Sequence, residues 1–136
     1  MYSAHLHCKK TSVMQIVKTI LLYLLVAFYL FMGSAHLIAP AQYYAMMPSW
    51  LPMQTILIYL SGCIEILLAI LLLFTKSRKN AAKAIIAMLI AFLILIHIPQ
   101  SIGYYKTEHA DFLLSIARIP MQFLLIGWAW LFTKNQ

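Results

Sequence analysis

The sequence predicts an all-α integral membrane protein, a four-helix bundle with both termini in the cytoplasm. Three observations predict this class. First, 64% of the 136 residues are hydrophobic and only 10% are charged, which is more apolar surface than one soluble core of this length can bury. Second, the apolar residues form long runs separated by short polar or proline-containing segments. Third, lysine and arginine concentrate at alternate breaks, as the positive-inside rule describes for multi-pass proteins.

Four apolar runs are long enough to cross a bilayer as helices, which takes about 20 residues at a rise of ~1.5 Å each. The predicted spans are residues 18–38, 53–75, 81–98 and 111–132. The breaks between them are "PAQYYAMMPSWLP", "TKSRKN" and "PQSIGYYKTEHAD". The first run is long for a signal peptide and lacks a small-x-small cleavage site, so we expect a retained span. Residues 1–17 then form a basic cytoplasmic arm, and residues 18–136 form a single membrane domain.

The basic residues predict the orientation of this domain. One side of the membrane receives Lys9, Lys10, Lys18, Lys76, Arg78, Lys79, Lys83 and Lys134, and the other receives Lys106 and Arg118. We therefore expect the termini and the middle loop in the cytoplasm. The net charge of +7 follows from this topology, so the expected partner is the lipid bilayer and not nucleic acid. The aromatic residues of the two outer loops, such as Trp50, Tyr43 and Tyr104, are expected to form an interfacial belt.

Polar side chains within the spans are the candidate functional residues. A charged group there carries an insertion cost of ~2.5 to 3.5 kcal/mol and needs a partner, a cavity or neutralisation. Glu65 is the deepest charge, about 18 Å along the second span. The residues predicted to form a ligand-binding site or a polar core are His36, Ser61, Glu65, His97, Gln100, Arg118 and Gln122.

Helical spacing places these residues on facing stripes. Ser61 and Glu65 are four residues apart, as are Arg118 and Gln122, so each pair lies on one helix face. We expect the two stripes to face each other, with Arg118 as the partner of Glu65. Two interpretations stay open, namely a buried ion pair that only sets helix register and a site for a ligand or a proton.

Two prolines also have two possible roles. Pro99 either ends the third span or kinks it, and Pro120 either marks a late start of the fourth span or opens polar space within it.

The sequence shows no recognised catalytic motif. It contains no phosphate loop, no nucleophilic triad and no CxxC pair. Two histidines on separate spans are a weak pattern for haem or zinc, so no metal site is predicted. Whether the protein is an enzyme is left open, and its catalytic residues are unknown.

Five ordered motifs resemble the DoxX-like family of small four-span bacterial membrane proteins. They are "GSAHLIAP", "MMPSWLP", "YLSGCIEILLAILLL", "HIPQSI" and "RIPMQFLLIGWAW", and they extend from about residue 29 to 133. The family's motif positions fall on His36, Pro48, Leu51, Pro52, Ser61, Gly62, Glu65, Arg118, Pro120 and Gln122. Gln100 stands where many relatives have asparagine.

The resemblance implies a multi-pass protein of the bacterial cytoplasmic (inner) membrane that is associated with redox metabolism. Family members include a subunit of a thiosulfate:quinone oxidoreductase, and others are linked to thiol oxidative stress. The first hypothesis is therefore an accessory redox protein that binds a quinone or another small lipophile. Its expected partners are membrane or redox proteins. His36, Gln100, Arg118 or Gln122 would donate to the ligand and Glu65 would relay a proton.

Two other functions are compatible with the sequence. The alternative hypothesis is a non-enzymatic structural subunit of a membrane complex, in which the polar cluster only fixes helix packing. Ion or proton transport would need a continuous polar path across the membrane. Residues 67–74 and 124–131 carry no charges, which argues against transport.

Overall fold

The computed structural model describes the backbone of residues 2–134 and the side chains of residues 13–134. Over this range the chain is helical and contains no strand. The elements are α1 (Tyr2–Ile38), α2 (Ala41–Tyr44), α3 (Gln54–Leu73), α4 (Thr75–Phe92), the π-helical segment η1 (Leu93–His97), α5 (Ile98–Lys106) and α6 (Phe112–Trp130).

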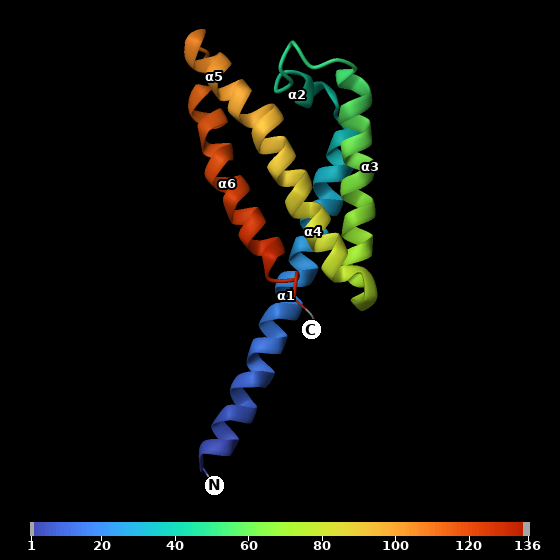
Figure 1. The fold of residues 1–136 in the computed structure, drawn as a ribbon, viewed down its shortest axis with the longest axis vertical. Coiled ribbons are helices and arrows are strands. Elements are labelled where there is room, and N and C mark those ends of the chain that lie inside the picture. Colours follow the sequence, from blue (N-terminus) through green and yellow to red (C-terminus); the bar gives the residue numbers. More distant parts are fainter. Residues whose placement is uncertain (1, 135–136) are drawn as a thin grey trace.

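Four helical segments are long and apolar enough to cross a membrane. They are Val13–Ile38, Gln54–Leu73, Thr75–Lys106 and Phe112–Trp130. The prediction of an all-α bundle with four helices long and apolar enough to cross a membrane is therefore confirmed. The first helix begins at Tyr2, so the basic segment predicted as an arm continues the helix of the first span and projects beyond the other helices (Figure 1).

Neighbouring spans pack in an up-and-down order. The helix α3 packs on α1 and α4, while α6 packs on α4 and α5. One end of the bundle carries the α3–α4 turn and the end of α6, and we call it the basic end. The opposite end carries α2 and the α5–α6 turn, and we call it the loop end (Figure 1).

The apolar core lies in the half of the bundle near the basic end. Its buried members are Leu22, Leu25, Val26, Tyr29, Leu68, Ala69, Leu72, Ala81, Ala82, Ile85, Leu89, Ala129 and Phe132. Trp128 joins α6 to α1 in this half, because its indole Nε1 donates to the carbonyl of Leu21 at 3.1 Å. The four spans are therefore held together at this end.

Two glycines let α1 and α3 come into backbone contact. A Cβ atom built on Gly62 would lie 2.8 Å from the carbonyl oxygen of Gly33, and one on Gly33 would lie 2.7 Å from that of Gly62. Only glycine allows so close an approach without moving a helix. Gly62 is therefore the point of α3 at which the backbone of α1 comes closest.

The start of the third span differs from the prediction. Residues 75–80 were expected as a basic loop, but α4 already begins at Thr75, one residue after α3 ends. Ser77 Oγ donates to the carbonyl of Leu71 at 2.7 Å, and Arg78 Nε donates to that of Leu72 at 2.9 Å. These side chains satisfy the last carbonyls of α3, which lets the chain reverse within one residue.

The end of the third span also differs, because the helix continues beyond Pro99 to Lys106. The π-helical segment η1 immediately precedes the proline. In a regular α-helix the proline has no N–H to donate, and its ring clashes with the carbonyl one turn earlier. The π-helical turn contains one extra residue and so changes which carbonyl faces the proline. Pro99 therefore does not end the span. Pro120 lies inside α6 and is not a late start of the fourth span.

Candidate functional site

A cavity of about 660 Å³ lies between the four spans in the half near the loop end. Its walls come from α1, α3, the α4–η1 region and α6, and the segment between α1 and α3 also contributes. Most of its exposed lining is apolar. The polar cavity, as we call it, lies beyond the apolar core along the bundle.

Six of the seven predicted site residues line this cavity. They are His36, Ser61, Glu65, His97, Arg118 and Gln122. The seventh, Gln100, lies behind Arg118 and accepts a 3.4 Å hydrogen bond from its Nη1 atom. The two stripes expected on the second and fourth spans thus border one space, together with residues of the first and third.

The partner of Glu65 is His36 and not Arg118, which corrects the predicted pair. His36 Nδ1 lies 3.4 Å from Glu65 Oε2. The cause is the glycine contact between α1 and α3. The two helices run antiparallel, and each side chain lies against the glycine of the other helix: a Cβ atom built on Gly62 would lie 2.8 Å from His36 Cβ, and one built on Gly33 would lie 3.1 Å from Glu65 Cβ.

The hydrogen bonds of His36 indicate its tautomer. Nδ1 lies 3.0 Å from the carbonyl oxygen of Met32, one turn earlier. A carbonyl can only accept, so Nδ1 carries the proton of this hydrogen bond. The ring of Tyr43 packs on the imidazole with centroids 3.9 Å apart. The imidazole is thereby held between the carboxyl group and a ring from the loop-end segment.

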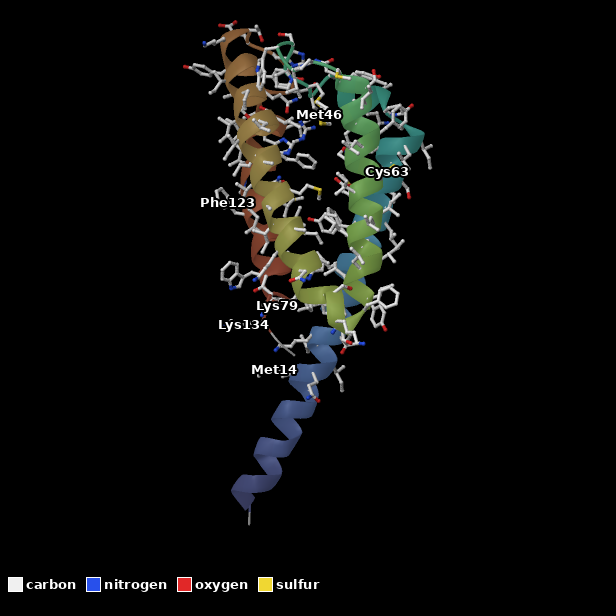
Figure 2. All side chains as sticks on the ribbon, turned by 45° about the vertical axis from the view of Figure 1, so that its right-hand side comes forward. Met14, Met46, Cys63, Lys79, Phe123 and Lys134 are labelled. Carbon is white, nitrogen blue, oxygen red and sulfur yellow. The ribbon has the colours of Figure 1, made fainter. Side chains whose placement is uncertain are left out.

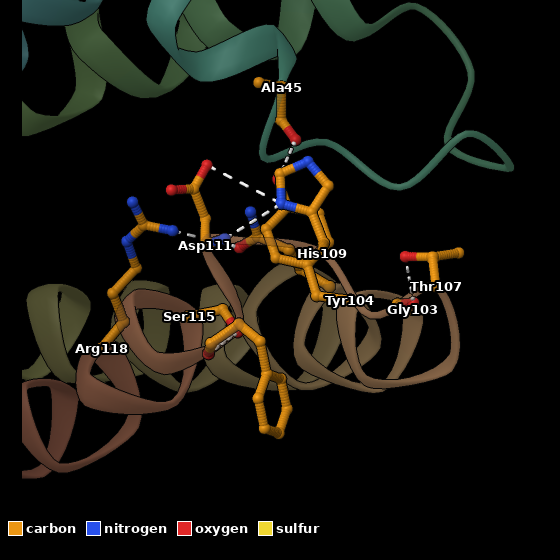
Figure 3. Close-up of polar contacts among 10 residues, drawn as sticks. Ala45, Gly103, Tyr104, Thr107, His109, Asp111, Ser115 and Arg118 are labelled. Atoms are coloured by element: carbon orange, nitrogen blue, oxygen red, sulfur yellow. Dashed lines mark hydrogen bonds and ion pairs between the residues drawn. The ribbon is translucent and has the colours of Figure 1, made fainter.

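Several polar contacts lie near the loop end, in α5 and in the α5–α6 turn (Figure 3). Tyr104 Oη donates to the carbonyl of Ala45 at 2.9 Å and its ring stacks on His109. His109 Nδ1 lies 3.8 Å from Asp111 Oδ2. The first of these contacts connects the segment that follows α1 to α5, and the others join α5 to the α5–α6 turn or lie within that turn.

Two predicted donors are used within the protein. Gln122 Nε2 donates to the carbonyl of Leu89 at 2.8 Å and joins α6 to α4. Ser61 Oγ donates to the carbonyl of Ile58 at 2.8 Å, within its own helix. Both residues line the cavity. Their donors are used within the protein, and only their oxygen acceptors are left for a ligand.

Three buried polar atoms on the cavity wall have no hydrogen-bond partner in the structure, namely Tyr29 Oη, Glu65 Oε2 and His97 Nδ1. Gln100 Nε2 and Ser101 Oγ, on the same helical span as His97, also lack one. Buried polar groups are nearly always paired, and an unpaired one costs about 1–3 kcal/mol. Among the described residues, the buried side-chain nitrogen and oxygen atoms without a hydrogen bond thus all lie on the cavity wall or within four residues of His97.

Two tyrosines and five methionines line the cavity but were not among the residues predicted from the sequence. Tyr29 is counted in an apolar run, and Tyr43 was expected in the interfacial belt, yet both line the cavity. Burial, and then the nearby Glu65, raises the pKa of the Tyr43 phenol above its usual value. Five of the eight methionines also line the cavity, namely Met32, Met46, Met47, Met88 and Met121. Their spacing carries no signal, because they come from different segments.

The structure gives no support for a metal centre within the described residues. No group of three or more His, Cys, Asp or Glu side chains lies close enough to hold an ion there. Cys63 is exposed on α3 (Figure 2). The side chain of Cys8 lies outside the described residues.

The fold and the cavity together define the class of protein, an all-helical bundle with four helices long and apolar enough to cross a membrane and a largely apolar cavity between them. Residues 25–133 match the family model described as "Domain of unknown function (DUF8561)". Because the match covers well over half of the chain, the protein belongs to this family. No curated protein and no solved structure matches the chain.

Proposed function

We propose that the protein binds a small amphipathic lipophile, with a quinone as the first candidate, in the polar cavity. The observation that carries this proposal is that three buried atoms on the wall of a largely apolar cavity, Tyr29 Oη, Glu65 Oε2 and His97 Nδ1, have no hydrogen-bond partner. Of these, only Glu65 Oε2 faces a charged or polar ring, that of His36, with Nδ1 at 3.4 Å. A ligand with an apolar ring and oxygen substituents would supply the missing hydrogen bonds and fill the apolar space.

The size and the lining of the cavity support this ligand class. A volume of about 660 Å³ lies within the range of ~300–1,000 Å³ that is typical of small-molecule sites. The Tyr29 hydroxyl and the Arg118 guanidinium are donors for a carbonyl oxygen, and Glu65 accepts from a hydroxyl or relays its proton. The methionines adapt their shape to an irregular ligand, since their side chains are unbranched and polarisable.

The cellular setting is part of the same proposal. We infer from the DoxX-like resemblance that the protein resides in the bacterial cytoplasmic membrane as an accessory of redox metabolism. The positive-inside rule places the basic end, and with it both termini, in the cytoplasm. A membrane-impermeant maleimide tests the orientation in intact cells, using Ser49→Cys at the loop end of a chain with both natural cysteines changed to serine. Labelling of this cysteine is expected, and its protection in intact but not in lysed cells would reverse the orientation.

Two contacts favour the structural subunit as the second candidate. The Gln122–Leu89 and Arg118–Gln100 hydrogen bonds each join parts of the chain that are far apart in sequence. If the polar cluster serves only packing, Glu65→Gln and Arg118→Gln will lower the melting temperature in detergent and have no other effect. Proton transport has weaker support, because the buried cluster near the basic end consists of apolar side chains and one tyrosine.

The proposal is tested by ligand binding to the purified protein. Mass spectrometry of lipid extracts identifies a co-purifying lipophile, and titration with a short-tailed quinone gives its Kd. Glu65→Gln removes the carboxylate without changing its shape and is expected to weaken binding about ten-fold, as loss of a hydrogen bond to a charged group does. Glu108→Gln, an exposed substitution at the loop end, is the matched control. Equal quinone affinity in the wild type and both variants, with no co-purifying lipophile, would refute the proposal.

A further inference from the structure

A second cavity lies at the basic end, away from the polar cavity, where the α3–α4 turn meets the end of α6. Its volume is about 450 Å³. Five cationic side chains line it, namely Lys76, Arg78, Lys79, Lys83 and Lys134, and Phe132 is part of its wall. Figure 2 shows Lys79, near the start of α4, and Lys134, beyond α6, at the same end of the bundle. Two distant segments thus bring their charges to one space, which we call the basic cavity.

The charges of the basic cavity are not balanced by side-chain carboxylates. It holds five of the ten lysine and arginine residues of the chain. The chain has only three acidic residues. Glu65 lines the polar cavity, and Glu108 and Asp111 lie between α5 and α6 at the loop end. Like charges around one hollow repel each other even when Lys79 is left out of the count, and a bound anion would relieve this repulsion.

The surroundings of the basic cavity favour a lipid over a free anion. The cavity lies where α3 and α6 reach the end of their membrane spans, at the level where lipid headgroups are found. Large apolar side chains at these helix ends are exposed, among them Leu73, Phe74, Trp130 and Leu131. A lipid bound here would place its phosphate in the cavity and its acyl chains along this apolar surface. Basic pockets at the membrane surface of transmembrane helices recognise anionic headgroups in this way.

One of the five cations also has a structural task. Arg78 donates from Nε to the carbonyl of Leu72 and from Nη2 to that of Leu73, at 2.9 and 3.3 Å. Its guanidinium group is thereby held in place at the end of α3, beside the lysines. Lys76 and Lys83 are exposed on α4, so they can be exchanged without opening the core.

We propose that the basic cavity binds the headgroup of an anionic phospholipid of the surrounding bilayer. The proposal is independent of the ligand in the polar cavity, since it uses none of the same residues. It predicts a preference for phosphatidylglycerol over phosphatidylcholine, because the two lipids share a phosphate group but only the first has a net negative charge. It also predicts that the preference weakens at high salt.

The test measures the melting temperature of the full chain in a neutral detergent during titration with lipid. Phosphatidylglycerol is expected to raise the melting temperature of the wild type, whereas phosphatidylcholine and inorganic phosphate at equal concentration are not. The double variant Lys76→Gln/Lys83→Gln removes two charges from the cavity. Its apparent affinity for phosphatidylglycerol is expected to fall by about thirty-fold, since each lysine near an anionic surface contributes about five-fold and the two contributions multiply.

The matched control is Lys18→Gln/Lys106→Gln, which removes the same charge from two residues outside the cavity, both exposed. It is expected to keep the affinity of the wild type. An equal loss in both double variants would refute the site, because the attraction would then follow net charge alone. An equal response to phosphatidylcholine would also refute it. A response to inorganic phosphate as large as that to phosphatidylglycerol would overturn the lipid assignment and indicate a small-anion site. Melting temperatures without added lipid show that each variant is folded.

Discussion

Removing one hydroxyl group distinguishes a ligand site from a packing cluster, because its effects on stability and on binding have opposite signs. Tyr29 is only 2% exposed and its Oη atom has no hydrogen-bond partner. Leaving such a group unpaired costs about 1–3 kcal/mol. Tyr29→Phe removes the cost and keeps the ring. The free energy of unfolding of the empty protein is therefore expected to rise by about 1 kcal/mol, the lower limit of that range.

The same substitution removes a donor to the ligand. A net hydrogen bond contributes about 0.5–1.5 kcal/mol, so the Kd for a quinone is expected to rise about two- to twelve-fold. Thermal unfolding in detergent measures the first effect, and quinone titration measures the second. Tyr23→Phe is the matched control, since Tyr23 lies on the same helix but is 60% exposed, and we expect it to change neither quantity. A lower stability of Tyr29→Phe together with an unchanged Kd would refute the reasoning, because the hydroxyl would then serve the fold.

Two predictions concern the packing that positions the site. Gly62→Ala would place a Cβ 2.8 Å from the Gly33 carbonyl oxygen, so the free energy of unfolding should fall by about 1–3 kcal/mol because of overpacking. Gly103→Ala places its Cβ in open space, so the free energy of unfolding should rise by up to about 1 kcal/mol because of helix propensity. Thermal unfolding measures both changes. Equal stability of the two glycine variants would contradict the backbone contact. Trp128→Phe removes the indole hydrogen bond that joins α6 to α1 and should cost about 1 kcal/mol, whereas Trp130→Phe, at an exposed position, should cost less than half as much. A larger loss of stability for Trp130→Phe than for Trp128→Phe would show that the hydrogen bond between α6 and α1 does not stabilise the bundle.

The spans and the membership of the polar cluster could be predicted from the sequence. Hydropathy identifies helices because a lipid-exposed backbone must form its own hydrogen bonds, and this rule applies to each segment separately. Isolated polar residues in apolar runs indicate the interior of a bundle for a similar reason, since a polar group facing lipid is costly. Six of the seven residues selected in this way line one cavity.

The boundaries around the third span could not be predicted from the residues that surround them. The "TKSRKN" segment has the composition of a loop, yet Ser77 and Arg78 cap α3 and allow α4 to begin at Thr75. Pro99 has the appearance of a helix end, yet the preceding π-helical turn lets the helix continue. Both boundaries depend on hydrogen bonds made at the junction of two helical elements. The amino-acid composition of a segment does not show whether such hydrogen bonds form.

Hydropathy and isolated polar residues were enough to predict a four-span helical bundle with Glu65 in a polar group inside it. The contact of Glu65 with His36 and that of Arg118 with Gln100 are seen only in the folded chain. Hydropathy and helical spacing define which face of a span is polar, but not how the spans are rotated and shifted against each other. That choice depends on where backbones can approach, and here the contact of Gly33 with Gly62 brings the histidine of α1 to the carboxyl group of α3.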